Sequence, residues 1–490
     1  MTRSEFQVQY AQGPDALYGL FQQMEQTIAA MSVTVQTLEQ TVANLTARIH
    51  ELEGQLKKDS HNSSKPPSSD GYKRKPVSLR TPSGKKPGGQ AGHPGATLCL
   101  SDSPNPVIPH APETCSFCGT SLSGVPASGH ERHQVYDLPP LSLQVTEHQA
   151  ETKRCPHCQT QTAAAFPEGV TQTVQYGPDI KALLVYLHTF QLLPYERIGN
   201  LVSDLFGACP SEGTLFTSLG TAFEALAPVE AAIQDAVTRA RVAGFDETGC
   251  RIMGKLHWLH TATTGTLTFY GHHEKRGREA MDALSVLPGF TGTAMHDAFS
   301  SYFGYTGCDH ALCNAHLLRE LIFVKGLPEQ PWSAGMLDLL IEIKHAVDAA
   351  RNQGQGQLTP ESRNDFTVRY DRLVQEGLAC SPKAVPTGKR GRTKQTPAYN
   401  LLVRLKTHKV PVLRFMDRFD IPFDNNQSER DLRMMKVKQK VSGCFRSQVG
   451  ASFFCRIRGY IATLRKQGVS LLPALQSVFT GNPVMPILSG

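Results

Sequence analysis

A seven-residue repeat of apolar side chains between residues 17 and 56 predicts one long helix of the coiled-coil type. The apolar positions advance by alternating steps of four and three, at Leu17, Phe21, Met24, Ile28, Met31, Val35, Leu38, Val42, Leu45, Ile49, Leu52 and Leu56. Ile and Val at the first core position, with Leu or Met at the second, favour a parallel pair of helices. We therefore expect residues 1–56 to form a leucine-zipper-like coiled coil that makes a homodimer or higher oligomer. Packing of the apolar stripe on the chain's own body is the alternative.

Positive charge is concentrated in three tracts of a chain that has a net charge of +7 over 490 residues. Residues 57–110 hold nine Lys/Arg against three acids, residues 381–410 eight against none, and residues 425–466 ten against two. Separate basic tracts are typical of proteins that bind a polyanion, although one tract alone also fits a solubilising surface. Residues 57–110 are also rich in Pro, Gly and Ser, which predicts a linker without a core of its own.

The sequence favours a cytoplasmic protein with no membrane partner. The N-terminus lacks the apolar segment of a signal peptide, and no run approaches the roughly 18 apolar residues of a membrane span. The twelve cysteines fall into two close pairs and eight singles, unlike the dense framework of a small secreted domain.

Two Cys-x-x-Cys pairs predict a zinc-binding domain at residues 111–165. Cys115 and Cys118 form the first pair, and Cys155 and Cys158 form the second. Four thiolates offered from two tight turns satisfy the tetrahedral coordination of a structural Zn²⁺ ion. The alternating apolar side chains of the intervening segment predict a strand of a zinc β-ribbon, at Leu141, Leu143 and Val145. Alternative ligands are His130, His133 and His157.

Residues 170–235 are expected to form a helical, helix-turn-helix-like DNA-binding domain. One helix runs from Tyr195 to Gly207, and Ser211 can cap the next helix after a short turn. Helix, glycine turn and helix is the layout of a helix-turn-helix, but many helical hairpins share it. DNA contact and simple packing therefore both remain open for this segment.

After residue 240 the pattern changes to short strands. We expect strands at Arg241–Ile252, Leu256–Thr263 and Thr266–His272, a helix at Arg278–Leu287, and strands at Gly292–Asp297 and His310–Cys313. This order resembles a ribonuclease H-like core, whose first part we place at residues 240–316. The whole chain is thus expected to be a multidomain α+β protein.

Three acids are candidates for a divalent metal site. Asp246 ends an apolar stretch of the first strand, Asp297 ends the fourth strand, and Glu429 opens a helix. A carboxylate at the end of an apolar strand is costly unless something binds it, and Mg²⁺ prefers carboxylates, water and phosphate oxygens. Because side chains alternate along a strand, only one of Asp246 and Glu247 can join the site, and we choose Asp246. Asp309, in a turn, is the weaker competitor for the second position.

A helical insertion is expected at residues 317–410, with the second part of the core at residues 411–470 and a tail at 471–490. The insertion ends in a basic loop whose candidate DNA contacts are Lys389, Arg390 and Arg392. On the next helix Arg433, Lys436 and Lys440 share a face with Glu429, which predicts a basic stripe for a phosphate backbone. Arg430 is a further candidate for DNA contact. The alternative is a solvated face with a Glu–Arg pair.

Several motifs together resemble the insertion-sequence family sixty-six transposases of the DDE superfamily. They are Asn-Ser-Ser-Lys-Pro-Pro-Ser-Ser-Asp (62–70), the two Cys-x-x-Cys pairs, Phe-Asp-Glu-Thr (245–248), Asn-Asn-Gln-Ser-Glu-Arg-Asp-Leu-Arg (425–433), Ser-Gly-Cys-Phe-Arg-Ser (442–447) and Ile-Arg-Gly-Tyr-Ile-Ala-Thr-Leu-Arg-Lys-Gln-Gly (457–468). The resemblance implies that Asp246, Asp297 and Glu429 are the catalytic acids. Cys313 and His316 match a Cys-x-x-His signature of several DDE families, which we interpret as packing around the site rather than a zinc site.

The resemblance also implies a mechanism and partners. Two Mg²⁺ (or Mn²⁺) ions held by the three acids would support DNA cleavage at the element's ends and attack of the freed 3′-OH on target DNA. The expected partners are the terminal inverted repeats, target DNA and accessory proteins of the same element, in a nucleoid-associated assembly. The alternatives are a non-catalytic zinc-ribbon and helix-turn-helix regulator, or a ribonuclease H-like nuclease that cuts without joining.

Overall fold

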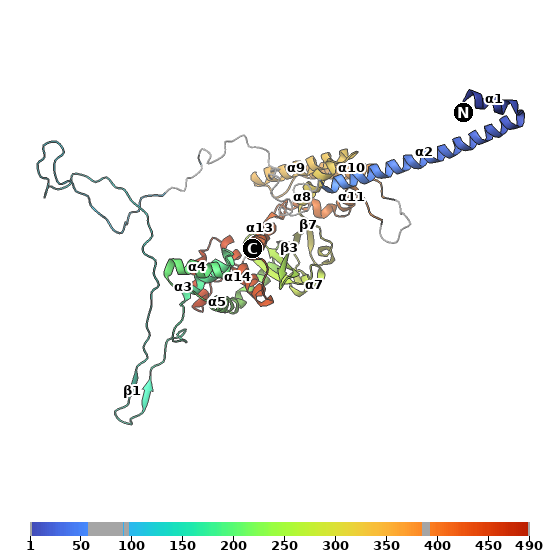
Figure 1. Cartoon of the computed structure of the whole chain (residues 1–490). Coiled ribbons are helices and arrows are strands. Elements are labelled where there is room, and N and C mark those ends of the chain that lie inside the picture. The colour runs from blue at the N-terminus through green and yellow to red at the C-terminus, as the bar shows by residue number, and fades with distance from the viewer. Residues whose placement is uncertain (1, 57–91, 93–97, 385–392, 489–490) are drawn as a thin grey trace. The chain divides into compact units, whose positions relative to one another are not determined.

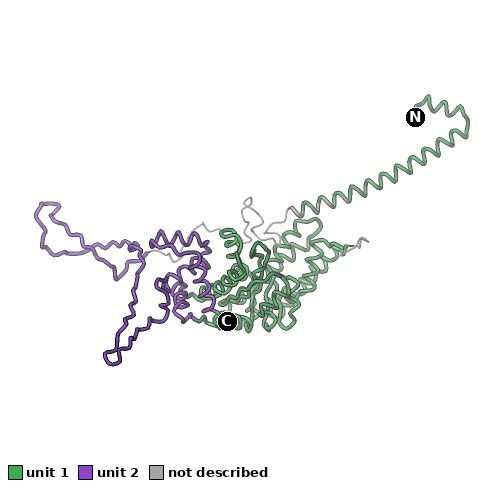
Figure 2. Tube along the Cα trace, turned by 60° about the horizontal axis from the view of Figure 1, so that its bottom comes forward, with its two compact units in different colours: residues 1–77, 227–469, 485–490 green, residues 78–226, 470–484 purple. Residues whose placement is uncertain are grey.

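The computed structural model describes residues 2–56, 92, 98–384 and 393–488 (Figure 1). The chain divides into two compact units, one of residues 1–77, 227–469 and 485–490, the other of residues 78–226 and 470–484 (Figure 2). Helices, a mixed sheet and a small two-stranded sheet give a mixed α/β protein, in agreement with the expected α+β class. Over the described ranges no helix combines the length and the apolar character that a bilayer crossing needs.

The N-terminal heptad repeat lies on a single helix. A short helix, α1 (Arg3–Ala11), is followed by α2 (Pro14–Leu56). From Phe21 to Leu52 every apolar side chain of the repeat is exposed in the single chain, with 62% exposure at Ile28 and 61% at Val42. A stripe this long has no counterpart within the helix itself, so its apolar surface is available to a partner.

The second unit holds the cysteine pairs and a helical cluster. A hairpin of β1 (Thr152–Arg154) and β2 (Gln161–Ala163) precedes α3 (Pro178–Val185), which continues as the π-helical turn η2 (Tyr186–Phe190). Helices α4 (Tyr195–Phe206) and α5 (Glu212–Ala225) follow. Their core holds Leu184, Ile198, Val202 and Leu215.

The turn between α4 and α5 has the predicted chemistry. Gly207 ends α4 in the left-handed conformation at φ 71°, which glycine adopts without a steric penalty. Ser211 caps the N-terminus of α5, because its hydroxyl accepts a hydrogen bond from the Thr214 N–H. One expectation differs: the segment predicted to be a tail begins with helix α15 (Leu471–Phe479), which packs on α3 and α5. Leu471, Ala474, Leu475 and Val478 are buried in that packing, and this apolar spacing explains the helix.

A five-stranded mixed sheet forms the centre of the first unit. Its strands are β3 (Val242–Ile252), β4 (Lys255–Thr263), β5 (Thr268–His273), β6 (Thr293–His296) and β7 (Asp309–Leu312). The order across the sheet is β5-β4-β3-β6-β7. The first three strands are antiparallel to one another, whereas β6 and β7 run parallel to β3. Consequently β3 and β6, the two strands expected to carry aspartates, are direct neighbours.

Helices cover the sheet. Helix α13 (Asn426–Ser442) packs on β3 and β4, α14 (Gln448–Lys466) packs on β5, and α6 (Ala227–Thr238) packs on β5 and α14. Phe245 contacts Phe290, which follows the short helix η3 (Leu287–Gly289), and Tyr302, which is the first residue of η4 (Tyr302–Gly304). The helix predicted at 278–287 is shorter, because α7 (Arg278–Ala283) ends before Ser285, which has a positive φ of 57°.

The described part of the segment expected to be an insertion, residues 317–410, is mainly helical. The helices between β7 and α13 are α8 (Asn314–Lys325), α9 (Pro331–Asn352), α10 (Pro360–Cys380), α11 (Pro397–Thr407) and α12 (Lys409–Asp417), so the first and the last extend beyond the expected bounds. Their core is continuous with that of the sheet, because Met295 and Ala311 of β6 and β7 belong to the same buried cluster as Trp332 and Tyr370. Helix α12 packs on β7, and Figure 1 shows α8–α11 gathered beyond that edge of the sheet.

Candidate active site

Asp246 lies on the face of β3 that α13 covers. Gly244, two residues earlier on the same face, has no side chain, and a Cβ there would clash with Ser428 Oγ and Asn425 Oδ1 of the helix start. Asn425 Nδ2 also donates a hydrogen bond to the Phe245 carbonyl at 2.9 Å, and Ser428 Oγ donates to Asn425 Oδ1 at 2.7 Å. The first turn of α13 is therefore fixed directly beside Asp246.

Asp297 follows the last residue of β6, the strand that pairs with β3. Its Oδ1 accepts a hydrogen bond from the Phe299 N–H at 2.9 Å, and Ala298 has a positive φ of 71°. The aspartate is thus held directly after a buried strand.

Two neutral histidines support the turn after β6. The Ala298 N–H donates to His296 Nδ1 at 3.2 Å, so His296 Nε2 carries the proton and donates to His310 Nδ1 at 3.1 Å. His310 Nε2 in turn donates to the Tyr305 carbonyl at 3.0 Å. Burial holds the pKa of His296 well below its ordinary value and lowers that of His310, in accord with uncharged rings.

Glu429 lies in the first turn of α13, close to α8. Its Oε1 is 3.4 Å from Arg319 Nη2 and 3.6 Å from His316 Nδ1. The side chain is 23% exposed, so water still reaches it. The carboxylate therefore lies at the rim of the acidic group rather than deep in the core.

The three predicted acids are near enough for their charges to interact, but among the described residues their carboxylates do not form one group within 4.8 Å. The pKa of Asp246 lies well above its usual range, first because of burial, then because of the negative charges of Glu247 and Asp297, with a smaller effect from Glu429. Like charges gathered without a compensating cation favour protonation, and a bound divalent cation would reverse that preference. Carboxylates partly open to water are the donors that Mg²⁺ and Mn²⁺ prefer, so this set fits such an ion.

Glu247 is a buried acid to which the sequence assigned no function. Its carboxylate accepts hydrogen bonds from the Tyr302 hydroxyl and from Arg276 Nε, the latter at 2.7 Å. The Arg276 guanidinium also lies over the rings of Trp258 and Phe299, at 5.0 and 4.2 Å. Burial raises the pKa of Glu247 despite these hydrogen bonds. Since Phe299 and Tyr302 belong to the turn after Asp297, this cluster ties that turn to β3.

Asp309, the weaker competitor, lies away from the acidic group. It pairs in register with Thr293, at the beginning of β6, whereas Asp297 follows the end of that strand. Its carboxylate forms an ion pair with Arg414 at 2.8 Å. Asp309 is therefore the first residue of β7 rather than part of a turn, and it lies at the end of the parallel strands opposite to Asp297.

The predicted basic stripe on α13 differs in part from the structure. Arg430, Arg433 and Lys440 are exposed. Lys436 is half-buried and donates a hydrogen bond to the Gly249 carbonyl at 3.0 Å, so its ammonium group faces the sheet rather than a free surface. The three loop candidates Lys389, Arg390 and Arg392 lie outside the described residues.

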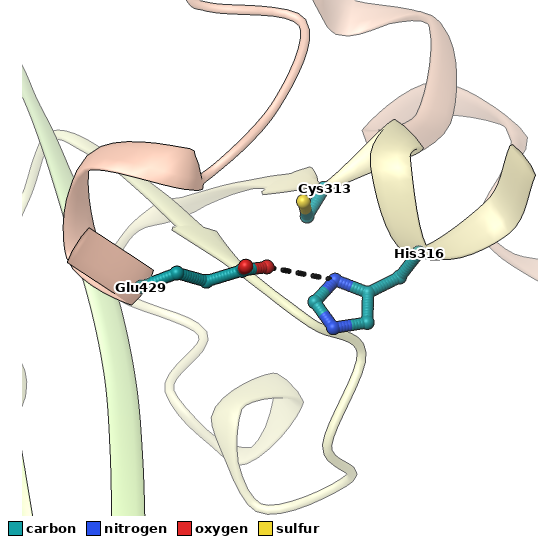
Figure 3. Close-up of side chains that lie close together, drawn as sticks. All are labelled: Cys313, His316 and Glu429. Atoms are coloured by element: carbon teal, nitrogen blue, oxygen red, sulfur yellow. Dashed lines mark ion pairs between the residues drawn. The ribbon is translucent and has the colours of Figure 1, made fainter. Parts of the chain in front are cut away.

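Cys313, His316 and Glu429 form a compact group (Figure 3). One ligand atom from each lies within 4.8 Å of the other two, and among the described residues this is the only such group of three or more His, Cys, Asp or Glu side chains. Cys313 Sγ accepts a hydrogen bond from the Asn425 N–H at 3.2 Å. The Cys-x-x-His spacing signals the first two members, but the third is 113 residues further along and leaves no local signal in the sequence.

The two Cys-x-x-Cys pairs adopt the same turn. In the first, the Cys115 N–H donates to the Thr120 carbonyl at 2.8 Å, and in the second the Cys155 N–H donates to the Thr160 carbonyl at 2.9 Å. Cys118 and Cys158 each form a 3.3 Å hydrogen bond with the threonine of their own turn. The pKa of both thiols is lowered to about 7, and the hydrogen bonds with these threonines are the largest cause.

Such thiols are well suited to a metal that needs thiolates, so the donor chemistry fits Zn²⁺. In the described ranges, however, the four sulfurs do not form one group within 4.8 Å, and no histidine among His130, His133 and His157 completes one. The predicted strand at Leu141–Val145 is absent from the described structure; the strands are β1 and β2 on either side of the second pair. The tight turn brings Arg154 and Gln161 directly opposite each other, which explains pairing there rather than between the two turns.

Comparison with known families covers most of the chain. The family described as "Transposase IS66 family" matches residues 173–453, and the zinc-finger binding domain of transposase IS66 matches residues 112–159. A family of unknown function, DUF6444, matches residues 21–98. An uncharacterised protein of Sinorhizobium fredii, y4jO, is 37% identical over 162 residues, which are 33% of this chain and 45% of that protein. The chain thus spans less than half the length of this curated relative.

Proposed function

This chain belongs to the IS66 family of transposases, and from that premise we propose that it cuts DNA at the ends of its element and joins the freed 3′-OH to target DNA. Asp246, Asp297 and Glu429 are the proposed catalytic acids. The observation that carries the proposal is where these acids lie: Asp246 is on β3, Asp297 follows the neighbouring parallel strand β6, and Glu429 is in the first turn of α13, which packs on β3. An acidic group of this kind is costly in a fold unless it binds cations.

We assign the five-stranded sheet and its helices to a ribonuclease H-like core with a helical insertion. Three antiparallel strands followed by two strands parallel to the first support this assignment, as does an acid on β3, after β6 and on α13. The helices between β7 and α13 separate the third acid from the first two along the chain, and the packing of α13 on β3 supports a place for it near them.

Asp246, Asp297 and Glu429 would hold two Mg²⁺ or Mn²⁺ ions. When bound, such ions activate water for attack on a phosphodiester and stabilise the leaving oxygen. The chain's own contribution is positioning: Asn425 fixes the start of α13 against β3, and the Glu247, Arg276 and Tyr302 cluster fixes the turn that follows Asp297. No serine or tyrosine nucleophile is needed for this chemistry.

The remaining parts are proposed to bind DNA and a second protomer. The exposed stripe on α2 supports pairing of two chains, which would hold two DNA ends together. The cysteine turns, with Zn²⁺ on Cys115, Cys118, Cys155 and Cys158, and helices α4 and α5 would recognise the terminal inverted repeats. The exposed Arg430, Arg433 and Lys440 would contact phosphates near the acids, and accessory proteins of the element are further partners.

A strand-transfer assay tests the proposal. Pre-cut ends with a free 3′-OH are incubated with a target plasmid and Mg²⁺, and joined products are counted for the wild type and for Asp246→Asn, Asp297→Asn and Glu429→Gln. Each variant should lose joining by several orders of magnitude and still bind the ends. Asp309→Asn, a carboxylate at the opposite end of the strands, is the matched control and should join normally.

The alternatives give different results. A nuclease would cut uncleaved ends in a metal-dependent manner and leave pre-cut ends unjoined. A non-catalytic regulator would bind the ends and show neither reaction. Full joining by any of the three variants would remove that residue from the catalytic group.

A further inference from the structure

We propose that Cys313, His316 and Glu429 form a binding site for one zinc-class divalent cation, separate from the cysteine turns of the second unit. The three side chains come from adjoining elements: Cys313 precedes α8, His316 lies in the first turn of α8, and Glu429 lies in the first turn of α13. Figure 3 shows them directed toward a common point.

The spacing of the donor atoms is close to that of a tetrahedral site. Zn²⁺ binds sulfur at about 2.3 Å and nitrogen or oxygen at about 2.0–2.2 Å, so its ligand atoms lie about 3.3–3.6 Å apart. His316 Nδ1 and Glu429 Oε1 are already 3.6 Å apart, and the donor atoms of all three residues lie within 4.8 Å of one another. Binding of an ion would require the sulfur to move closer to the other two donor atoms by up to about 1.5 Å.

The imidazole nitrogen that faces Glu429 has no hydrogen-bond partner among the described residues. His316 Nδ1 is buried, and a carboxylate oxygen lies near it without forming a hydrogen bond. A neutral imidazole ring presents either a lone pair or a single proton at that atom. A cation bound between the ring and the carboxylate would satisfy both groups.

One contact of Cys313 is of the kind found at metal-bound thiolates. The Asn425 N–H, at the beginning of α13, donates to the sulfur at 3.2 Å, and hydrogen bonds of this kind stabilise the negative charge of a metal-bound thiolate. The Arg319 guanidinium, 3.4 Å from Glu429 Oε1, opposes a cation. The thiolate formed when the Cys313 thiol releases its proton on binding offsets that charge.

The mixed set of sulfur, nitrogen and oxygen donors selects the class of ion. Zn²⁺ and Co²⁺ accept thiolate, imidazole and carboxylate together, whereas Mg²⁺ prefers oxygen alone. Three protein ligands leave the fourth position of a tetrahedral ion open. One consequence rests on the proposed function. If Glu429 also belongs to the catalytic group, zinc bound here withdraws Glu429 from Asp246 and Asp297.

Metal stoichiometry of the full chain tests the proposal. The purified protein is equilibrated with Zn²⁺, freed of unbound metal and analysed for bound zinc. The wild type should hold one ion more than Cys313→Ser, which keeps a hydrogen-bond acceptor for Asn425. Cys455→Ser, which alters another buried thiol outside the group, is the matched control and should hold as much zinc as the wild type. Equal zinc in the wild type and Cys313→Ser overturns the proposal.

Cobalt absorption gives a second measurement in a chain whose four turn cysteines are serine. Co²⁺ should produce a thiolate-to-metal absorption band in the near ultraviolet, and adding Cys313→Ser or His316→Gln should abolish or strongly weaken it. An unchanged band in both variants refutes the site, and circular dichroism verifies that each chain is folded. Because neither measurement uses DNA, a negative result here leaves the proposed function standing, and failure of strand transfer leaves the zinc site standing.

Discussion

Gly244→Ala is expected to separate the start of α13 from β3 and so to misplace Glu429 relative to Asp246. A Cβ at this position would lie under 3.0 Å from Ser428 Oγ and from Asn425 Oδ1. Both side chains are short and buried, at 0% and 6% exposure, and they hydrogen-bond each other. Neither can swing away as the end of a long side chain would, so the helix itself must move.

The size of the effect follows from this geometry. Restoring ordinary carbon contacts of about 3.5–4.0 Å requires a shift on the order of 1 Å. Overpacking of this kind costs about 1–3 kcal/mol, and a misplacement of about 1 Å in a catalytic group can lower a rate by about 100-fold. We therefore expect a lower melting temperature and a loss of strand transfer of about two orders of magnitude.

Gly265→Ala is the matched control, because a Cβ there meets nothing within 4 Å and its φ lies outside the left-handed range. It should leave both joining and melting close to the wild type. The assay is strand transfer from pre-cut ends, with thermal melting followed by circular dichroism. Wild-type joining by Gly244→Ala would contradict the claim that this close approach sets the position of Glu429.

Three further predictions concern charge and assembly. The pKa of Asp246 in the folded chain lies above its unfolded value of about 4. The protonated carboxyl of Asp246 therefore contributes fully to stability below about pH 4, and this contribution is lost as pH rises through the folded pKa. Asp246→Asn should therefore raise the melting temperature of the metal-free chain at pH 7 while abolishing joining, and equal melting would contradict this. The pKa of His296 is lower in the folded chain than in the unfolded chain, so its contribution to stability is full above about pH 6.5 and is lost as pH falls from there toward the folded pKa. The melting temperature should therefore decline below pH 6.5, and it should decline less steeply in His296→Asn. An equal slope in the two proteins would argue against a neutral ring. Val35→Lys should convert dimers into monomers in light scattering, because a valine buried between two helices stabilises the pair by about 1.5–3 kcal/mol. Gln36→Lys, outside the apolar stripe, should leave the dimers intact.

The elements of the core could be predicted from sequence because their signals are local. Alternating apolar residues indicated β3, and an apolar stretch that ends in an acid indicated β6 and Asp297. The same alternation explains why Glu247 faces away from α13, where Tyr302 and Arg276 hold it. Its partners could not be predicted, because they lie 55 and 29 residues away and the contacts depend on the turn after β6.

Helical periodicity had a similar limit on α13. Spacing alone placed Lys436 on the same face as Arg433, but spacing does not say how closely a neighbouring strand approaches that face. The Gly249 carbonyl accepts a hydrogen bond from the Lys436 ammonium group, because β3 extends along the helix as far as Ile252. The apolar alternation at Leu141–Val145 failed for a related reason: without a neighbouring strand to pair with, alternation does not make a sheet.

The insertion has a consequence for the order in which the protein becomes competent during synthesis. Phe245 and Asn425, which join β3 to the start of α13, lie 180 residues apart. Both aspartates leave the ribosome long before Glu429, and the five helices of the insertion must be made in between. A nascent chain therefore carries an incomplete acidic group until the insertion has been translated, so the proposed reaction with DNA cannot begin before that point.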